Sequence, residues 1–445
     1  MSAPSIVWFR DDLRLSDHPA LSAALGRGRP VVLLYLFDEE SAGIRPLGGA
    51  TRWWLHHSLA AHAAEIARLG GRLVLRRGAA EEELPRLVAE AGADAVFWNR
   101  RYGAGREVDA RLKAVLRDAG VEVASFAANL LVEPWEVTTG AGTPYQVFTP
   151  FWRAARERPM REPLPAPRDL PSVPGVASDD LDSWKLLPTR PDWAAGLRET
   201  WEPGENSASR RVERFAAEGL ADYHRRDEPS VGTSGLSPHL RFGEISPAQI
   251  WHRMHGNLTP AARRNVPKFL SELGWRDFHW SILYAHPDLA TRNYRAAYDE
   301  FPWVWDHGPA VAAWRQGRTG IPLVDAGMRE LMSTGTMHNR VRMVVASFLV
   351  KNLLRHWRLG EEWFWDTLVD ADEASNPGNW QWVAGSGADA APYFRVFNPD
   401  LQAKKFDPDG EYLRRWVPAE EQLAPIVDLA ESRREALEAF STLRR

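Results

Sequence analysis

The first 130 residues alternate short apolar runs with helical stretches, and this alternation leaves few folds open. Five runs are apolar or rich in β-formers, and they span residues 6–9, 31–37, 73–76, 95–98 and 122–126. Helical stretches occupy residues 53–69, 81–91 and 110–119 between them. Repeated strand–helix units of this length predict a parallel sheet with helices on both faces.

The loop after the first run argues against one common use of such a sheet. Dinucleotide-binding domains carry the glycine pattern G-x-G-x-x-G at this point, whereas this chain reads FRDDLRLSDHPAL. Residues 1–130 are therefore expected to form an α/β domain that is not an ordinary nicotinamide-binding domain.

The rest of the chain changes character twice. Residues 131–195 are rich in proline, with REPLPAPRDLPSVPGV at their centre, and predict a linker that wraps along the surface. From residue 196 to residue 445 apolar side chains recur at helical spacing, without strand-like alternation. This third part is therefore expected to be all-α.

Composition narrows the cellular setting. The 445 residues include no cysteine, which excludes disulfides and cysteine-ligated metal sites and fits a reducing cytoplasm. The N-terminus has no signal-peptide pattern, and no apolar run approaches the length of a membrane span. The 21 tryptophans suit a core or stacking against flat ligands. A net charge of −4 still allows arginines to cluster on a phosphate-binding face.

The densest group of functional side chains lies in DADEASNPGNWQWVAGSGADAAPYFRVFNP, residues 370–399. Asp370 and Asp372 precede Asn376, and Trp380 and Trp382 follow it. The carboxylates can accept from the polar edge of a planar redox-active ring, the amide can face a ring nitrogen, and the indoles can stack or exchange electrons. On these residues alone, a helix cap beside core tryptophans is an equal alternative.

A turn rich in hydroxyl groups precedes Pro238. It comprises Thr233, Ser234, Gly235, Leu236 and Ser237. Hydroxyls, a glycine and free helix N–H groups can bind a phosphate. Because such turns are more often simple helix caps, this one indicates a phosphate site only together with other features.

Two further helices place polar side chains where a core stripe would be apolar. Glu272, Trp275 and Arg276 stand at i, i+3 and i+4 in ELGWRDFHWSIL and so share one face. This triplet suits a pocket that stacks a flat ligand, although a solvated ion pair beside a core tryptophan is the commoner arrangement. The helix MHNRVRMVVASFLVKNLL adds Asn339, Arg340, Arg342 and Met343.

In combination these motifs resemble those of the DNA photolyase and cryptochrome family. The matching blocks are IVWFRDDLRLSDHPAL, TSGLSPHLRFGEIS, ELGWRDF, AWRQGRTGIPLVDAGMREL, MHNRVRM, NWQWVAGSGADAAPYFRVFNP and KFDPDGEYLRRWVP. They occur in the family's order over essentially the whole chain. The resemblance implies a Rossmann-like α/β antenna domain, a long linker and an all-α C-terminal domain that buries FAD. The periodicity indicates the same architecture independently.

The resemblance also implies a role for each motif. FAD would contact Tyr223, Thr233, Ser234, Gly235, Leu236, Ser237, Arg276, Arg342, Asp370, Asp372 and Asn376, with Asn376 beside ring nitrogen N5. A flipped-out lesion would lie between Trp275 and Trp382 and touch Glu272, Asn339 and Met343, with Arg276 and Arg340 also in the DNA-binding set. Electrons would reach the flavin through Trp380, Trp357 and Trp303, with Trp305 as the alternative third member.

The activity implied is light-dependent repair of cyclobutane pyrimidine dimers by electron transfer from reduced FAD. The tripeptide MHN, which contains His338 and Asn339, favours this lyase reaction over that of a (6-4) photolyase. The asparagine at position 376 favours it over a signalling cryptochrome. Both stay alternatives.

The antenna pigment would be methenyltetrahydrofolate, or else an 8-hydroxy-deazaflavin, with His56, His57 and Glu107 as candidate contacts. The chain would act on dimer-containing DNA as a cytoplasmic monomer.

Overall fold

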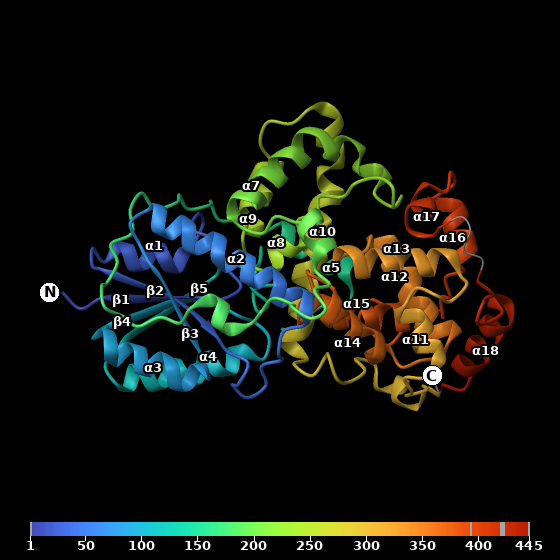
Figure 1. Ribbon diagram of the computed structural model, residues 1–445, viewed down its shortest axis with the longest axis horizontal. Coiled ribbons are helices and arrows are strands. Elements are labelled where there is room, and N and C mark those ends of the chain that lie inside the picture. Colours follow the sequence, from blue (N-terminus) through green and yellow to red (C-terminus); the bar gives the residue numbers. More distant parts are fainter. Residues whose placement is uncertain (1, 392–393, 419–422, 444–445) are drawn as a thin grey trace.

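The molecule has two parts that lie side by side (Figure 1). A five-stranded parallel sheet and its helices, within residues 5–126, form the α/β half, and the helices from residue 195 onward form the helical half. The computed structural model describes residues 2–391, 394–418 and 423–443. The strands are β1 (Ser5–Phe9), β2 (Val31–Phe37), β3 (Leu73–Arg77), β4 (Ala95–Asn99) and β5 (Glu122–Phe126). Their order is β3-β2-β1-β4-β5, and every neighbouring pair is parallel. The strand positions predicted from the sequence are confirmed to within one residue.

Helices cover both faces of this sheet. They are α1 (Pro19–Gly26), α2 (Gly49–Arg68), α3 (Ala80–Ala91) and α4 (Gly105–Asp118). Along β1, Val7 and Phe9 enter a core shared with α1 and α2, whereas Ile6 and Trp8 enter a core shared with α3 and α4. Because both sets of alternating side chains are buried, the strands read as continuous apolar runs.

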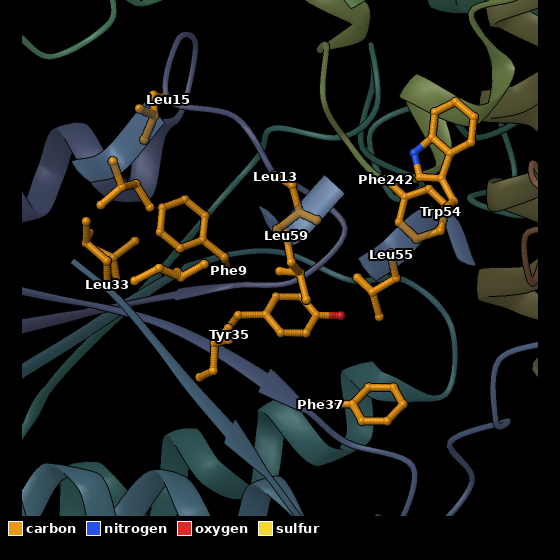
Figure 2. Close-up of a cluster of buried hydrophobic side chains, with 14 of the residues drawn as sticks. Phe9, Leu13, Leu15, Leu33, Tyr35, Phe37, Trp54, Leu55, Leu59 and Phe242 are labelled. Carbon is orange, nitrogen blue, oxygen red and sulfur yellow. The ribbon is translucent and has the colours of Figure 1, made fainter. Parts of the chain in front are cut away.

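The first of these cores extends into the helical half. Figure 2 shows Phe242, which follows α8 (Ser237–Arg241), next to Trp54 of α2. The two rings stack with centroids 6.1 Å apart, and the Trp54 indole N–H donates to Glu244 Oε1 at 3.0 Å. The two halves therefore share buried apolar surface.

The segment FRDDLRLSDHPAL after β1 connects the halves. Arg14 is fully buried, and its guanidinium donates to the carbonyl oxygens of Asp17, Ala128 and Gly243 at 3.1, 3.1 and 2.8 Å. The Asp17 carboxylate accepts from the guanidinium of Arg161, and also from the Ser246 hydroxyl. In place of a nucleotide-binding glycine loop, the first strand thus leads into a buried polar junction.

Residues 131–195 contain one α-helix, α5 (Phe148–Arg156). Its Phe151 packs against Phe278 of α10 (Pro260–Ala285), with ring centroids 5.4 Å apart. Further along the segment, Leu170 and Trp184 are buried in the core between the sheet, α1 and α2. This proline-rich part of the chain therefore contributes side chains to both halves.

From residue 195 onward, the regular secondary structure of the described residues is helical, and no strand is formed there. The helices are α6 (Ala195–Thr200), α7 (Glu205–Arg214), α8 (Ser237–Arg241), α9 (Pro247–Met254), α10 (Pro260–Ala285), α11 (Pro309–Arg315), α12 (Pro322–Thr334), α13 (Asn339–Ser347), α14 (Trp357–Thr367), α15 (Ser375–Ala384), α16 (Pro399–Phe406), α17 (Glu411–Trp416) and α18 (Leu429–Ser441). Within the described ranges, no helix has the length and apolarity that a membrane crossing requires.

The close approach of Gly48 to α14 generates a stability prediction. A Cβ atom on Gly48 would lie 2.2 Å from the Trp365 carbonyl oxygen and 2.5 Å from the Asp366 Cα. Gly48→Ala is therefore expected to destabilise the protein by about 1–3 kcal/mol, as overpacking does. Gly26→Ala is the control, because open space surrounds Gly26. Urea unfolding midpoints measure both, and equal midpoints would contradict the tight contact.

Candidate functional site

A cavity of about 500 Å³ lies in the helical half, in the size range of small-molecule and cofactor sites. Its walls come chiefly from α10, α13, α15, the loop between α14 and α15, and the turn before α8. The predicted site residues that line it are Tyr223, Ser234, Leu236, Ser237, Glu272, Trp275, Arg276, Asn339, Arg340, Arg342, Met343, Asp370, Asp372, Asn376, Trp380 and Trp382. Motifs separated by up to 159 positions in the sequence, from Tyr223 to Trp382, thus meet at one cavity.

The hydroxyl-rich turn meets the first aspartate, Asp370, through a hydrogen bond, and Arg342 on α13 forms an ion pair with the same carboxylate. Arg342 donates to both oxygens of Asp370, at 3.1 and 2.9 Å, and the Ser237 hydroxyl donates to the second of them at 2.7 Å. A bidentate guanidinium–carboxylate pair of this kind fixes direction as well as distance. The Ser237 hydrogen bond holds the start of α8 against the loop between α14 and α15, and the Arg342 pair holds α13 against the same loop.

Thr233 and Gly235 belong to the same turn without lining the cavity. Gly235 has a φ of +61°, and a Cβ there would lie 2.5 Å from Nη1 of Arg211. Arg211 is therefore a cation beside the turn that the sequence analysis missed. No local signal could have found it, because it lies on α7 and only the fold brings it close.

Asp372 and Asn376 set the start of α15. Asp372 Oδ1 accepts from the backbone N–H groups of Ala374 and Ser375 at 2.8 and 2.5 Å, so it caps the helix while it also lines the cavity. The Asn376 amide N–H₂ donates to the backbone oxygen and to Oε1 of Glu361, at 3.0 and 2.8 Å. The structural interpretation of this stretch, an aspartate near a helix cap, is therefore confirmed, and the ligand interpretation stays a prediction that these positions on the cavity wall allow.

On α10 the expected triplet shares one face, but its charged members do not pair with each other. Glu272 pairs with Lys268 at 2.7 Å, and Arg276 donates to the Asn129 carbonyl oxygen at 2.6 Å. Trp275 stacks on Phe148, with ring centroids 3.8 Å apart and planes 10° apart. The ion-pair alternative for Glu272 and Arg276 is therefore wrong, because each has a nearer partner.

The tryptophans expected to carry electrons occupy different depths. Trp380 lines the cavity and is 2% exposed, whereas Trp357 is fully buried behind the wall, where its indole N–H donates to Asn293 Oδ1 at 2.8 Å. A Cβ on Gly360 of α14 would meet the Trp380 ring at 2.1 Å, so the helix that Trp357 begins is in contact with Trp380.

Aromatic contacts continue from Trp357 to the surface. His356 lies 5.4 Å from Trp357, 5.3 Å from Trp303 and 3.7 Å from Trp305, measured between ring centroids. Trp305 is 56% exposed, and Trp303 is partly buried with its indole N–H donating to the Tyr298 carbonyl oxygen at 3.1 Å. Both candidates for the third position therefore contact the same histidine.

Several other lining residues were not singled out from the sequence. They include Arg226, Asp227, Lys268 and His279. Burial lowers the pKa of His279 to about 4, so this imidazole is neutral at physiological pH. Its ring also packs on Gly378, where a Cβ would lie 2.6 Å from the His279 Cδ2.

A smaller cavity of about 110 Å³ lies at the carboxyl ends of the strands. Arg10 follows β1 there and Arg100 follows β4, so the cavity is at the point where the strand order reverses, which is the usual ligand position in an open α/β sheet. His56, His57 and Glu107 do not line it. Arg276 and Asp372 line both cavities, which places the two sites next to each other.

The donor set of the larger cavity fits FAD. The carboxylates and the amide oxygen supply acceptors for a ring edge and a sugar chain. The hydroxyl turn supplies donors for a diphosphate, and Arg211, which lies beside the turn without lining the cavity, adds a positive charge there. Indoles on the same wall supply flat surfaces. These are the groups that a flavin nucleotide requires of a protein.

Two family models match the chain. The DNA photolyase model matches residues 5–168, and the model for the FAD binding domain of DNA photolyase matches residues 269–425. Over 429 residues the chain is 52% identical to a deoxyribodipyrimidine photo-lyase of Agrobacterium fabrum, covering 95% of this chain and 88% of that protein. It is 39% identical over 437 residues to cryptochrome-1 of Arabidopsis thaliana, covering 93% and 62%.

Solved structures give the same result. A bacterial class III photolyase from Agrobacterium tumefaciens superposes with a TM-score of 0.95 and 46% identity, over 100% of this chain and 98% of that one. An archaeal photolyase from Sulfolobus tokodaii with two FAD molecules superposes with a TM-score of 0.84 and 29% identity, over 98% and 99%. The predicted fold class, a parallel α/β half followed by a helical half, is confirmed.

Proposed function

The chain belongs to the DNA photolyase and cryptochrome family, and we propose that it repairs cyclobutane pyrimidine dimers in DNA in a light-dependent carbon–carbon lyase reaction with FAD. One observation carries the proposal. A single cavity combines acceptors suited to a flavin with two indoles, a carboxylate and an amide suited to a pair of pyrimidines. The 52% identity to a deoxyribodipyrimidine photo-lyase supports the same choice of substrate.

The polar wall would hold FAD. Asp370, fixed by Arg342 and Ser237, and Asp372, fixed by its helix cap, present carboxylate oxygens to the ring and ribityl chain. The turn formed by residues 233–237 would face the diphosphate of FAD, and Tyr223 would lie near that diphosphate. When bound in its reduced form, FAD supplies the light-driven electron that opens the cyclobutane ring and takes that electron back.

The aromatic part of the wall would receive the dimer after it leaves the DNA stack. A dimer pairs poorly with the opposite strand, so flipping it out costs less than flipping normal bases. Trp275, supported from behind by Phe148, and Trp382 would flank the dimer, while Glu272, Asn339 and Met343 would contact its pyrimidine edges. Arg340, held by Asp227 at 2.9 Å, would lie near the DNA backbone.

Trp380, Trp357 and a surface tryptophan would carry electrons to the flavin when it is oxidised. Support comes from their positions: Trp380 is at the cavity wall, Trp357 is in the core behind it, and Trp303 and Trp305 follow beyond His356.

An antenna pigment would bind the smaller cavity. Its place at the carboxyl ends of β1 and β4 supports a ligand there. Its lining holds six arginines, at positions 10, 45, 100, 101, 241 and 276, against five carboxylates, and this excess favours a ligand with negative charge. The carboxylates of methenyltetrahydrofolate suit this lining; an 8-hydroxy-deazaflavin stays the alternative, and the archaeal relative holds a second FAD.

We also propose that the protein acts as a monomer in the cytoplasm, where the absence of cysteine suits the reducing conditions.

The first prediction concerns cofactor and substrate together. Denaturation of the purified protein is expected to release roughly one non-covalent FAD per chain, because the site offers polar contacts and no cysteine. Under blue light the reduced protein should repair cyclobutane dimers in an oligonucleotide and leave the (6-4) lesion unchanged. Repair of the (6-4) lesion alone would favour the other photolyase class, and dimer binding without repair would favour a cryptochrome.

The second prediction separates electron supply from repair. Trp357→Phe should abolish photoreduction of oxidised flavin, yet chemically reduced protein should still repair dimers, because Trp357 lies behind the cavity wall. Trp184→Phe is the matched control, since Trp184 is also buried and its indole N–H also donates to a side chain. Loss of repair with photoreduction intact would reverse the assignment. Parallel Phe variants of Trp303 and Trp305 identify the outer member.

The third prediction concerns Trp382. Its replacement by alanine removes a stacking partner that contributes about 1–3 kcal/mol per base. Affinity for dimer-containing duplex should therefore fall far more than affinity for undamaged duplex, measured as dissociation constants over a salt series. Trp193→Ala serves as the control, because Trp193 is 41% exposed and does not line the cavity. Equal losses on both duplexes would show that Trp382 has only a structural role.

A further inference from the structure

Three side chains connect the α/β half to the larger cavity. Arg45, between β2 and α2, donates to both carboxylate oxygens of Glu361 on α14, at 2.7 and 3.1 Å. Glu361 in turn accepts from the Asn376 amide on α15 through Oε1 and through its backbone oxygen. The Glu361 side chain is 1% exposed and the Arg45 side chain 29%, so the carboxylate end of this connection is shielded from water.

These contacts determine which end of the Asn376 amide faces the cavity. A backbone carbonyl can only accept a hydrogen bond, so the amide atom 3.0 Å from the Glu361 carbonyl oxygen is the N–H₂ group. The ionised carboxylate takes a hydrogen from the same group. With both donor contacts inside the protein, Asn376 is left with its carbonyl oxygen for a ligand in the cavity that it lines.

The carboxylate keeps this arrangement only while it is ionised. Burial raises the pKa of Glu361, and the neighbouring Arg45 guanidinium lowers it. A protonated Glu361 would itself be a donor, so the amide would no longer be held in one orientation. Removal of a buried ion's partner is costly, and neutralisation of the remaining group is the usual response.

Arg45 is held firmly in place, although it comes from the other half of the molecule. Its guanidinium lies 4.1 Å from the centre of the Trp365 ring, and the Trp365 indole N–H donates to the Pro46 carbonyl oxygen at 2.8 Å. The backbone N–H of Gly49 donates to Asp366 Oδ1 at 2.8 Å. The segment at 45–49 is thus seated on α14, and Arg45 also lines the smaller cavity.

We propose that Arg45 is a positioning residue for the flavin site. Through Glu361 it holds the Asn376 oxygen toward the cavity. That oxygen then favours a flavin whose ring nitrogen N5, which would face it, carries a hydrogen. This inference rests on the proposed function, because it requires FAD in the larger cavity. Reduced flavin carries a hydrogen on that nitrogen and oxidised flavin does not. The α/β half therefore contributes to the preference of the helical half for reduced FAD.

The test is the midpoint reduction potential of FAD bound to the holoprotein, which reports the ratio of affinities for the reduced and oxidised forms. Arg45→Met should shift the potential to more negative values, by a roughly three- to tenfold loss of preference for reduced FAD, as expected for one hydrogen bond. Glu361→Gln should shift it in the same direction, because a neutral amide can present either end to Asn376. Arg45→Lys keeps the charge without the bidentate contact and should shift it less.

Arg111→Met is the matched control. Arg111 makes a similar two-bond contact with Glu81 on the surface of the α/β half and lines neither cavity. An unchanged potential in Arg45→Met and Glu361→Gln, with FAD bound, overturns the inference even if both variants are less stable to heat. If Arg45→Met does not fold, Glu361→Gln and Arg45→Lys decide. Wild-type protein that binds no FAD would instead contradict the proposed function.

Discussion

The fully buried guanidinium of Arg14 is the interaction on which the arrangement of the two halves depends. It is bonded to carbonyl groups in the loop after β1, in the segment after β5 and at Gly243 beyond α8. Separation of the halves would break its bond to Gly243, whereas its bonds to Asp17 and Ala128 lie within the α/β half and the segment just after β5. Breaking a buried charged contact costs about 3–5 kcal/mol. The junction therefore fixes the shared wall of the two cavities, where Arg276 and Asp372 line both.

Local periodicity was sufficient to predict the strands, three helices beside them and the helical character of the rest, but α1 and α5 were missed. The strands were predictable because a doubly covered parallel sheet leaves uninterrupted apolar runs, as in β2, where every residue is buried. The common face of Glu272, Trp275 and Arg276 followed from the helical repeat alone, and all three line the cavity. Motif resemblance then brought together residues from distant positions, which periodicity cannot do.

Contacts between distant segments were not predictable from the residues alone. Arg45 and Glu361 are 316 positions apart, and neither belongs to a pattern that indicates a partner. Arg211 approaches Gly235 only because α7 packs beside the turn, and Phe148 reaches Trp275 from the proline-rich segment. Asp372 was difficult for another reason. It accepts hydrogen bonds at the start of α15 and lines the cavity at once, so a structural role observed for it does not exclude the ligand role, which stays a prediction.

The buried junction at Arg14 also has a consequence for movement. Enzymes that close over their substrates need an interface that can open at little cost, such as a wet or loosely packed hinge. Here a hinge between the halves would have to expose a cation and break the stacking of Trp54 on Phe242. A photolyase built in this way presents an essentially preformed cavity, and the large conformational change in recognition falls on the nucleic acid, which must bend and unstack to deliver its damaged bases.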